Sequence, residues 1–473
     1  MQMQIQISAD IRINKKDMDD SMRQWIIRSL TLDNPEYDTG KKYQNSVQKI
    51  ERYLYLYRTS RKFFWLPRGF LYKFIRYLKG RNISFNIENK TQSVKNKGIH
   101  TYPPVSLYPH QERAVDKLIR ARQGLIVMPC GSGKTRTAIE CIRRIGGKAL
   151  VIVGSTFLIT QWQEYLDELF SVQTGLIQQK TFDIQDITIA TIQTLTSMHK
   201  RGELTQEFFN TFTTIVVDEV HHVSTESYQN IVNNFTAQYR IGTTATTERK
   251  DGLTRLIYYT MGQRVIKIST TQLAKENYLI PPEIRTIRTD FNMVGRARNF
   301  NTLTNRLIED DKRNKLIAAN LLSSRNNYNL ILSSRIKHLE NIAKIFKSSG
   351  YEYEIITSKI NQARRNEIIE RMQKGELHYI FATQLADEGL DIPILDRIHL
   401  VFPGSSAGRL EQRIGRVQRY YPNKEKPIVY DYLDDEVTIL RNMYNKRYNV
   451  YRALGLINIK KKKFATQGRF KLF

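Results

Sequence analysis

The stretch Met128-Pro-Cys-Gly-Ser-Gly-Lys134-Thr135 constrains the fold of this chain more than any other. It follows an apolar run at residues 125–127 and precedes residues 136–143, whose pattern predicts a helix. Gly131 and Gly133 allow a tight turn, so that backbone N–H groups can approach a phosphate. A strand, a glycine-bearing loop and a helix in this order predict a nucleotide-binding α/β domain. An ordinary helix start is the alternative, and Met128 departs from the usual pattern, which has glycine there.

The same loop supplies the groups expected to hold ATP and Mg²⁺. Backbone N–H groups of Gly131, Ser132 and Gly133 would surround the phosphates. Lys134 can reach the β- and γ-phosphates, and the Thr135 hydroxyl can bind Mg²⁺. ATP and Mg²⁺ are therefore the predicted cofactors.

A second candidate element lies about 85 residues downstream, where the apolar run 214–217 leads into Asp218-Glu219-Val220-His221-His222. Asp218 is expected to hold Mg²⁺, and Glu219 to take a proton from the attacking water. An acidic turn at a strand end is the simpler alternative, but its combination with the phosphate loop favours the catalytic interpretation. The two histidines could instead bind a metal, although neighbouring positions do not point easily at one ion.

The charge of the chain favours a polyanionic partner. Its formal net charge is +28 over 473 residues, and a nucleic acid is the expected partner. Solubility, or contact with acidic lipid, is the alternative reason for such a charge. No run approaches the ~20 apolar residues of a membrane span, and the N-terminus alternates like a strand instead of resembling a signal peptide. With only Cys130 and Cys141 present, no disulfide framework is predicted, and an intracellular location is expected.

Residues 1–100 differ in composition from the rest and predict a separate small domain. They hold 20 Lys and Arg residues against 9 Asp and Glu residues, a net charge of +11. Residues 52–58 alternate at the two-residue period of a strand, and the aromatic stretch 63–70 follows. Basic and aromatic residues on strands can grip a nucleic-acid backbone and stack on bases. A small tyrosine-rich core with solvated lysines is the alternative, and the composition does not decide between them.

Two successive series of apolar runs alternate with helical stretches, which predicts two α/β units with parallel sheets. The first series comprises residues 125–127, 149–153, 187–190, 215–217 and 239–241. The second follows a helical stretch at 307–322 and comprises residues 329–332, 353–356, 379–381, 397–401 and 427–430.

Several further motifs, in a fixed order, give the chain a resemblance to the superfamily 2 helicases. Within that superfamily it resembles the xeroderma-pigmentosum-B-like group, which has phage and large-DNA-virus members. The resemblance covers essentially the whole chain and includes a DEVH-type second motif at 218–221. In the first half it rests on Tyr108-Pro-His-Gln111, the phosphate loop, Gln161-Trp162, and residues 190–195 and 242–252. The resemblance implies that Gln111 reads adenine.

The second half carries three motifs of the same family, at residues 332–335, 382–393 and 411–419. The middle one implies that Gly389 and Asp391 contribute to nucleotide binding. In the last one, Gln412, Arg416 and Arg419 recur at helical spacing, so one helical face is expected to carry all three. The two arginines could neutralise charge on the γ-phosphoryl group, as arginine fingers do. A helix of solvated arginines is the alternative.

The expected fold is therefore two tandem RecA-like parallel-sheet lobes with a small α+β N-terminal accessory domain. The expected boundaries are 1–100 for the accessory domain, 101–268 for the ATP-binding lobe and 269–473 for the second lobe with a basic tail. The resemblance implies that the accessory domain contacts duplex or branched DNA. The expected activity is that of an ATP-dependent helicase or translocase acting on duplex or branched DNA. An RNA helicase, a transcript-releasing translocase and a non-catalytic nucleic-acid sensor are the alternatives.

The sequence also suggests classes of protein partner and a cellular location. Replication, recombination or transcription machinery are the candidate protein partners, and no membrane partner and a monomeric state are expected. The Lys-, Asn- and Ile-rich composition hints at an AT-rich, viral genome. In that case a host nucleus, a host cytoplasm or a virion would be the compartment.

Overall fold

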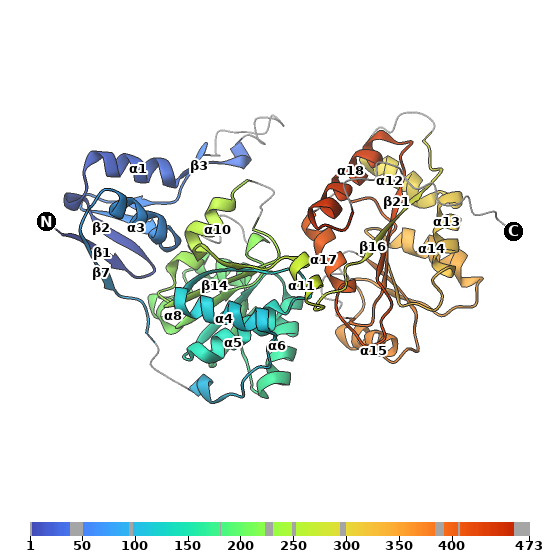
Figure 1. Ribbon diagram of the computed structural model, residues 1–473, viewed down its shortest axis with the longest axis horizontal. Helices are drawn as coiled ribbons and strands as arrows, with labels where there is room; N and C mark the ends of the chain where they lie inside the picture. Colours follow the sequence, from blue (N-terminus) through green and yellow to red (C-terminus); the bar gives the residue numbers. More distant parts are fainter. Residues whose placement is uncertain are drawn as a thin grey trace. The chain divides into compact units, whose positions relative to one another are not determined.

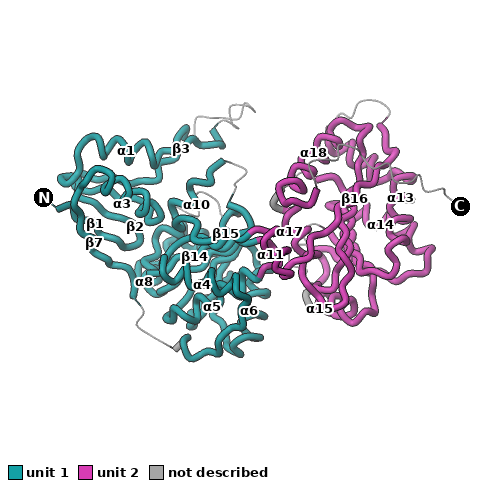
Figure 2. Tube along the Cα trace, viewed as in Figure 1, with its two compact units in different colours: residues 1–128, 133–268 teal, residues 129–132, 269–473 magenta. Residues whose placement is uncertain are grey.

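The structure is a computed structural model that describes residues 2–37, 51–93, 98–179, 181–222, 230–247, 252–293, 299–383, 392–404 and 407–457. The chain divides into two compact units (Figures 1 and 2). The first contains residues 1–128 and 133–268, and the second contains residues 129–132 and 269–473. Among the described residues, no helix is long and apolar enough to cross a membrane.

The N-terminal part of the first unit contains a five-stranded sheet in the order β5-β6-β2-β1-β7, and a two-stranded sheet of β3 and β4. Its strands are β1 (Met3–Ile7), β2 (Asp10–Asn14), β3 (Thr31–Asp33), β4 (Tyr53–Tyr55), β5 (Arg58–Thr59), β6 (Phe63–Pro67) and β7 (Phe85–Asn89). Its helices are α1 (Asp20–Leu30) and α3 (Leu71–Gly80) (Figure 1).

Alternation of apolar and polar residues gives this five-stranded sheet two unlike faces. Ile5, Ile11 and Ile13 are fully buried, whereas Gln6 and Arg12, which alternate with them on these strands, are polar. Helices α1 and α3 contribute buried side chains to the same apolar core, among them Ile26 and Phe74. This small α+β layer therefore has one apolar face covered by helices.

Two buried arginines join this layer to the parallel sheet of the same unit. Arg68, directly after β6, donates hydrogen bonds to the carbonyl oxygens of Ala237 and Gln238, the latter at 2.8 Å. Arg240 donates to the carbonyl oxygen of Ala9 at 2.6 Å. Burial lowers the pKa of both guanidinium groups, that of Arg240 to about 10. Carbonyl oxygens replace the water molecules that the two buried cations lose. One apolar core also runs through the N-terminal layer and the parallel sheet.

A close backbone approach at Gly69 makes this junction sensitive to a single methyl group. A Cβ at Gly69 would lie 2.2 Å from the carbonyl oxygen of Tyr258 and 2.6 Å from that of Tyr259. Gly69→Ala is therefore expected to lower the free energy of unfolding by ~1–3 kcal/mol, because backbone atoms must move apart. Urea unfolding followed by circular dichroism measures it. Gly80→Ala is the matched control, because a Cβ there meets nothing within 4 Å. Equal midpoints for the two variants would contradict the expectation.

The rest of the first unit contains an eight-stranded sheet in the order β11-β10-β12-β9-β13-β14-β8-β15, parallel except for β11. The strands are β8 (Gln123–Val127), β9 (Ala149–Val153), β10 (Gly175–Gln178), β11 (Thr181–Phe182), β12 (Ile187–Thr191), β13 (Thr214–Val217), β14 (Tyr239–Thr244) and β15 (Arg264–Lys267). The helices are α4 (Pro109–Ala121), α5 (Lys134–Ile145), α6 (Thr156–Phe170), α7 (Ile192–Lys200), α8 (Gln206–Thr211) and α10 (Thr254–Met261).

The second unit contains a six-stranded parallel sheet in the order β16-β21-β20-β17-β19-β18. The strands are β16 (Glu283–Arg288), β17 (Asn329–Ser333), β18 (Glu354–Ile356), β19 (Tyr379–Thr383), β20 (Arg397–Leu400) and β21 (Ile428–Leu433). The helices are α11 (Thr270–Lys275), α12 (Phe300–Glu309), α13 (Asp311–Leu322), α14 (Ile336–Lys347), α15 (Gln362–Gln373), α17 (Ala407–Val417) and α18 (Thr438–Ala453).

The predicted α/β class with two parallel sheets is confirmed, and two local predictions are wrong. The helical stretch predicted at 307–322 is two helices, because Asp310 ends α12 and caps α13 through a hydrogen bond from Arg313 N–H at 2.7 Å. The single strand predicted at 52–58 is divided between β4 and β5, which belong to different sheets.

Candidate functional site

The predicted phosphate loop connects β8 to α5. Gly131 and Gly133 have φ angles of +80° and +83°, a left-handed conformation that favours glycine. Gly133 is the N-cap of α5, so Lys134 and Thr135 occupy the first helical turn. The N–H of Met128 donates to the carbonyl oxygen of Thr244 at 3.0 Å, which fixes the start of the loop against β14.

Lys134 and Glu219 come together at the ends of β8 and β13. Lys134 Nζ lies 3.3 Å from Glu219 Oε1, and both side chains are mostly buried. The sequence separates these residues widely, but parallel strands bring their carboxyl ends to one edge of the sheet. The first unit therefore places an ammonium next to the second of two successive carboxylates, at the carboxyl edge of its parallel sheet.

Asp218 is held by side chains from two other elements. Its Oδ2 accepts a hydrogen bond from Trp162 Nε1 at 3.0 Å, and its Oδ1 accepts one from Thr243 Oγ1 at 2.5 Å. Burial, with a smaller contribution from the charge of Glu219, raises the pKa of Asp218 above its ordinary value. A cation at this carboxylate would reverse that shift, because it favours the charged form. The two carboxylate oxygens of Asp218 each accept one hydrogen bond and keep further lone pairs, so their chemistry fits a Mg²⁺ ion.

Glu219 has an unusual backbone conformation. Its φ of +47° lies in the left-handed region, which costs a residue other than glycine on the order of 1 kcal/mol or more. The N–H of Glu219 donates to Asp218 Oδ1 at 3.0 Å, and this contact closes the turn. His221 Nδ1 lies 2.8 Å from Thr244 Oγ1 and 3.4 Å from Glu219 Oε2. The strained turn therefore orients Glu219 between Lys134 and His221.

The histidines do not form part of a metal cluster in the described part of the chain. No group of three or more His, Cys, Asp or Glu side chains there could hold a metal ion. The side chain of His222 lies outside the described residues.

Gln111 lies against the phosphate loop. It is buried, and its Oε1 accepts a hydrogen bond from the N–H of Tyr108 at 2.9 Å, as part of a capping box at the start of α4. A Cβ at Gly133 would lie 2.1 Å from Gln111 Nε2. The side chain therefore stands beside the first turn of α5, and its predicted role in reading adenine stays a prediction.

The second unit does not carry its three predicted residues on one helical face. Gln412 and Arg416 belong to α17, but that helix ends at Val417, before Arg419. Directly after the helix, the carbonyl oxygen of Gln418 accepts a hydrogen bond from Ile280 N–H at 2.8 Å. The expectation of a single face is thus wrong for Arg419.

Arg419 is fixed by its backbone. It forms a single antiparallel bridge with Leu279, and its carbonyl oxygen accepts a hydrogen bond from Lys424 Nζ at 3.0 Å. The same ammonium donates to the carbonyl oxygen of Pro393 at 2.9 Å. Burial lowers the pKa of Lys424 to about 8. The predicted residues Gly389 and Asp391, just before Pro393, lie outside the described residues.

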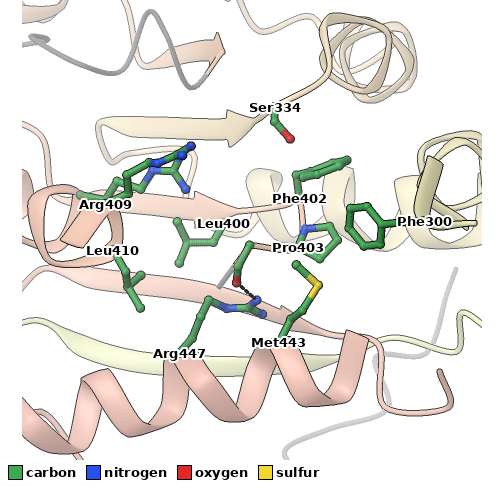
Figure 3. Close-up of a pocket in the computed structure, with 11 residues that line it drawn as sticks. Phe300, Ser334, Leu400, Phe402, Pro403, Arg409, Leu410, Met443 and Arg447 are labelled. Carbon is green, nitrogen blue, oxygen red and sulfur yellow. Dashed lines mark hydrogen bonds between the residues drawn. The ribbon is translucent and has the colours of Figure 1, made fainter. Parts of the chain in front are cut away.

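A separate pocket of about 270 Å³ lies in the second unit and contains none of the predicted site residues (Figure 3). Phe300, Phe402 and Met443 form its apolar wall. Arg447 lies at its base, where it donates to the carbonyl oxygen of Gly404 at 2.7 Å and to both oxygens of Asp431. These bonds engage the guanidinium on several sides, so Arg447 supports the pocket wall.

The comparisons with known proteins agree with this arrangement. Residues 104–249 match the family model of the type III restriction enzyme res subunit, and residues 311–421 match the helicase conserved C-terminal domain. A DNA 3'-5' translocase XPB2 of Sulfurisphaera tokodaii is 27% identical over 354 residues, which are 67% of this chain and 79% of that protein. The putative helicase 22 of a Sulfolobus islandicus filamentous virus is 27% identical over 68% of this chain and 62% of its own length.

The chain is a superfamily 2 helicase of the XPB-like group. As a member of this superfamily, the helicase hydrolyses ATP and binds nucleic acid.

Solved structures agree in fold with this helicase. An ATP-dependent type ISP restriction-modification enzyme, LlaBIII bound to DNA, has a TM-score of 0.56 at 15% identity, over 74% of this chain and 30% of that one. Dbp5 of S. cerevisiae bound to RNA has a TM-score of 0.55 at 14% identity, over 75% of this chain and 89% of that one. At these identities the likeness concerns the fold alone.

The sequence did not indicate two residues that hold the site of the helicase together. Trp162 and Thr243 belong to recognised motifs, but nothing in their spacing indicates that both donate to Asp218. The polar residue Thr243 at the end of an expected strand is the one sequence signal for a side chain near Asp218.

Proposed function

We propose that this helicase is an ATP-dependent DNA translocase that acts on duplex or branched DNA and separates or remodels its strands. The observation that supports the ATP site is the approach of Lys134 Nζ to Glu219 Oε1 at 3.3 Å, next to the buried Asp218. The net charge of +28 supports a nucleic-acid track held by phosphate contacts. Relatives named as DNA 3'-5' translocases and helicases support DNA as that track.

In this proposal the phosphate loop, Lys134 and Glu219 bind and activate the nucleotide. Backbone N–H groups at Gly131, Ser132 and Gly133 surround the phosphates, and Lys134 contacts the β- and γ-phosphates. Glu219 accepts a proton from the attacking water. Gln111 contributes to recognition of the base.

The metal ion and the second unit complete the proposal. Thr135 and Asp218 would hold Mg²⁺, which supplies positive charge to the phosphate oxygens when it is bound. Arg416 and Arg419, assisted by Gln412, neutralise charge that develops on the γ-phosphoryl group. Gly389 and Asp391 are assigned to nucleotide binding on the resemblance alone. Replication, recombination or transcription machinery remain the candidate partners.

The test is ATP hydrolysis with and without nucleic acid, combined with strand displacement. Duplex DNA is expected to stimulate ATP hydrolysis at least tenfold, and forked or Holliday-type DNA should be unwound or remodelled. The stimulation should fall as salt is raised from about 50 to 200 mM, because phosphate contacts release counterions. A helicase stimulated by RNA alone would contradict the choice of DNA. Displacement of RNA from an RNA–DNA hybrid, without unwinding of forks, would favour the transcript-releasing alternative.

A further inference from the structure

The face of the N-terminal five-stranded sheet opposite its apolar core carries aromatic and basic side chains in register. Arg12 on β2 pairs with Trp65 on β6, and Arg58 on β5 pairs with Trp65 from the other side. Asn14 pairs with Phe63 in the same way. Paired residues point to the same side of a sheet, so these five residues share one face, opposite to the apolar core. We call them the aromatic–basic face.

Direct contacts join the members of the aromatic–basic face. The rings of Phe63 and Trp65 have centroids 5.8 Å apart. The Arg12 guanidinium lies 4.8 Å from the centroid of Phe63, and that of Arg58 lies 5.8 Å from the centroid of Trp65. Both rings are only half-buried, and Arg58 is exposed. Two neighbouring rings, each with a guanidinium over it, therefore line an accessible surface.

The surroundings of this face add positive charge and amides. Arg61 and Lys62 occupy the exposed turn that leads into β6. The acidic residues nearby have partners, since Asp10 pairs with Arg58 and Glu88 with Lys90. Glutamines and asparagines continue the face across β1 and β7, where Asn86 Nδ2 donates to Gln4 Oε1 at 3.2 Å and Gln6 Nε2 donates to Glu88 Oε2 at 2.9 Å.

We infer that the aromatic–basic face binds unpaired bases of single-stranded DNA. Bases stack well on aromatic rings and on guanidinium planes, and cations beside the rings attract the phosphates. Bases inside a duplex are already stacked on each other, so flat rings on a sheet select unpaired strands. This inference rests on the proposed function, because strand separation produces the single strand that the face would hold.

The test measures binding of a fluorescently labelled oligothymidylate to the full chain by fluorescence anisotropy. The double substitution Phe63→Ala and Trp65→Ala is expected to weaken binding at least about tenfold, because two bases lose the aromatic rings on which they stack. A duplex of the same length should lose less than twofold. Tyr72→Ala is the matched control: Tyr72 is an exposed aromatic on α3 with Arg76 over its ring at 5.9 Å, but it belongs to the helical side of the layer. This control should bind like the parent.

A second measurement does not depend on a destabilising substitution. Stacking of a base on an indole quenches its fluorescence, so oligothymidylate should quench the parent and have little effect on Trp65→Phe, which keeps Trp25 and Trp162. Equal affinity in the double variant and the parent, or equal quenching in Trp65→Phe, would overturn the inference. DNA-stimulated ATP hydrolysis by the parent is recorded separately. Its absence would refute the proposed function, whereas the anisotropy would still report on the face.

Discussion

Lys134→Ala is expected to reduce DNA-stimulated ATP hydrolysis to background, and Glu219→Gln to reduce kcat by about 10²–10⁴-fold. The two side chains lie 3.3 Å apart, yet the two variants are expected to lose activity for different reasons. Under the proposed function, loss of Lys134 removes the cation that would meet the β- and γ-phosphates, so ATP affinity should fall as well. Glu219→Gln keeps the size and hydrogen-bonding ability of the side chain but removes the base, so ATP should stay bound.

Binding of a fluorescent ATP analogue, together with steady-state ATP hydrolysis, separates these outcomes. Lys117→Ala and Glu207→Gln are the matched controls, because both residues are exposed on helices of the same unit. Both controls should hydrolyse ATP at the parent rate. Turnover at the parent rate by Lys134→Ala or Glu219→Gln would remove these residues from the mechanism.

The sequence predicted the strand that carries each element of the candidate site because short-range signals define it. Apolar runs mark β8 and β13, and the glycines mark the loop whose φ angles are positive. The contacts around Asp218 could not be predicted in this way. Trp162 reaches it from α6, 56 residues away in sequence, and only the packing of that helix on the sheet brings the indole N–H there.

The contact between the N-terminal layer and the parallel sheet could not be predicted from the sequence for a similar reason. Arg68 and Arg240 look like surface residues of a basic chain, yet both are buried and satisfied by carbonyl oxygens. Burial of a guanidinium depends on which carbonyls the fold leaves exposed, and no local pattern encodes that. One apolar core runs through the N-terminal layer and the parallel sheet, and composition alone does not reveal that continuity.

Strand β14 links this junction to the candidate site. Its second residue, Arg240, donates to Ala9 of the N-terminal layer, and its later residue Thr243 donates to Asp218. Strand β14 is paired on both sides, by β13 along residues 239–242 and by β8 along residues 240–244, which makes it a stiff element. The N-terminal layer and the acidic turn therefore belong to one continuous framework within the first unit.

Arg416→Ala and Arg419→Ala are each expected to lower kcat for DNA-stimulated ATP hydrolysis by about 10³-fold, by analogy with other arginine fingers. ATP affinity should change little, because in the proposed function the phosphate loop and Lys134 hold the ground state. The two arginines are held differently, Arg416 in the last turn of α17 and Arg419 by the bridge to Leu279. They are nevertheless predicted to act on the same developing charge.

The double variant tests whether the two arginines act as a unit. Groups that stabilise one transition state together lose little more when both are removed, so the double variant should be nearly as active as the slower single variant. Nucleotide affinity, DNA affinity without nucleotide, and DNA-stimulated ATP hydrolysis are measured on all three variants. Arg441→Ala, an exposed arginine on α18, is the control and should match the parent. If both arginines proved dispensable for turnover, the γ-phosphoryl charge would have to be neutralised by Lys134 and Mg²⁺ alone, and the second unit would serve the nucleic acid only.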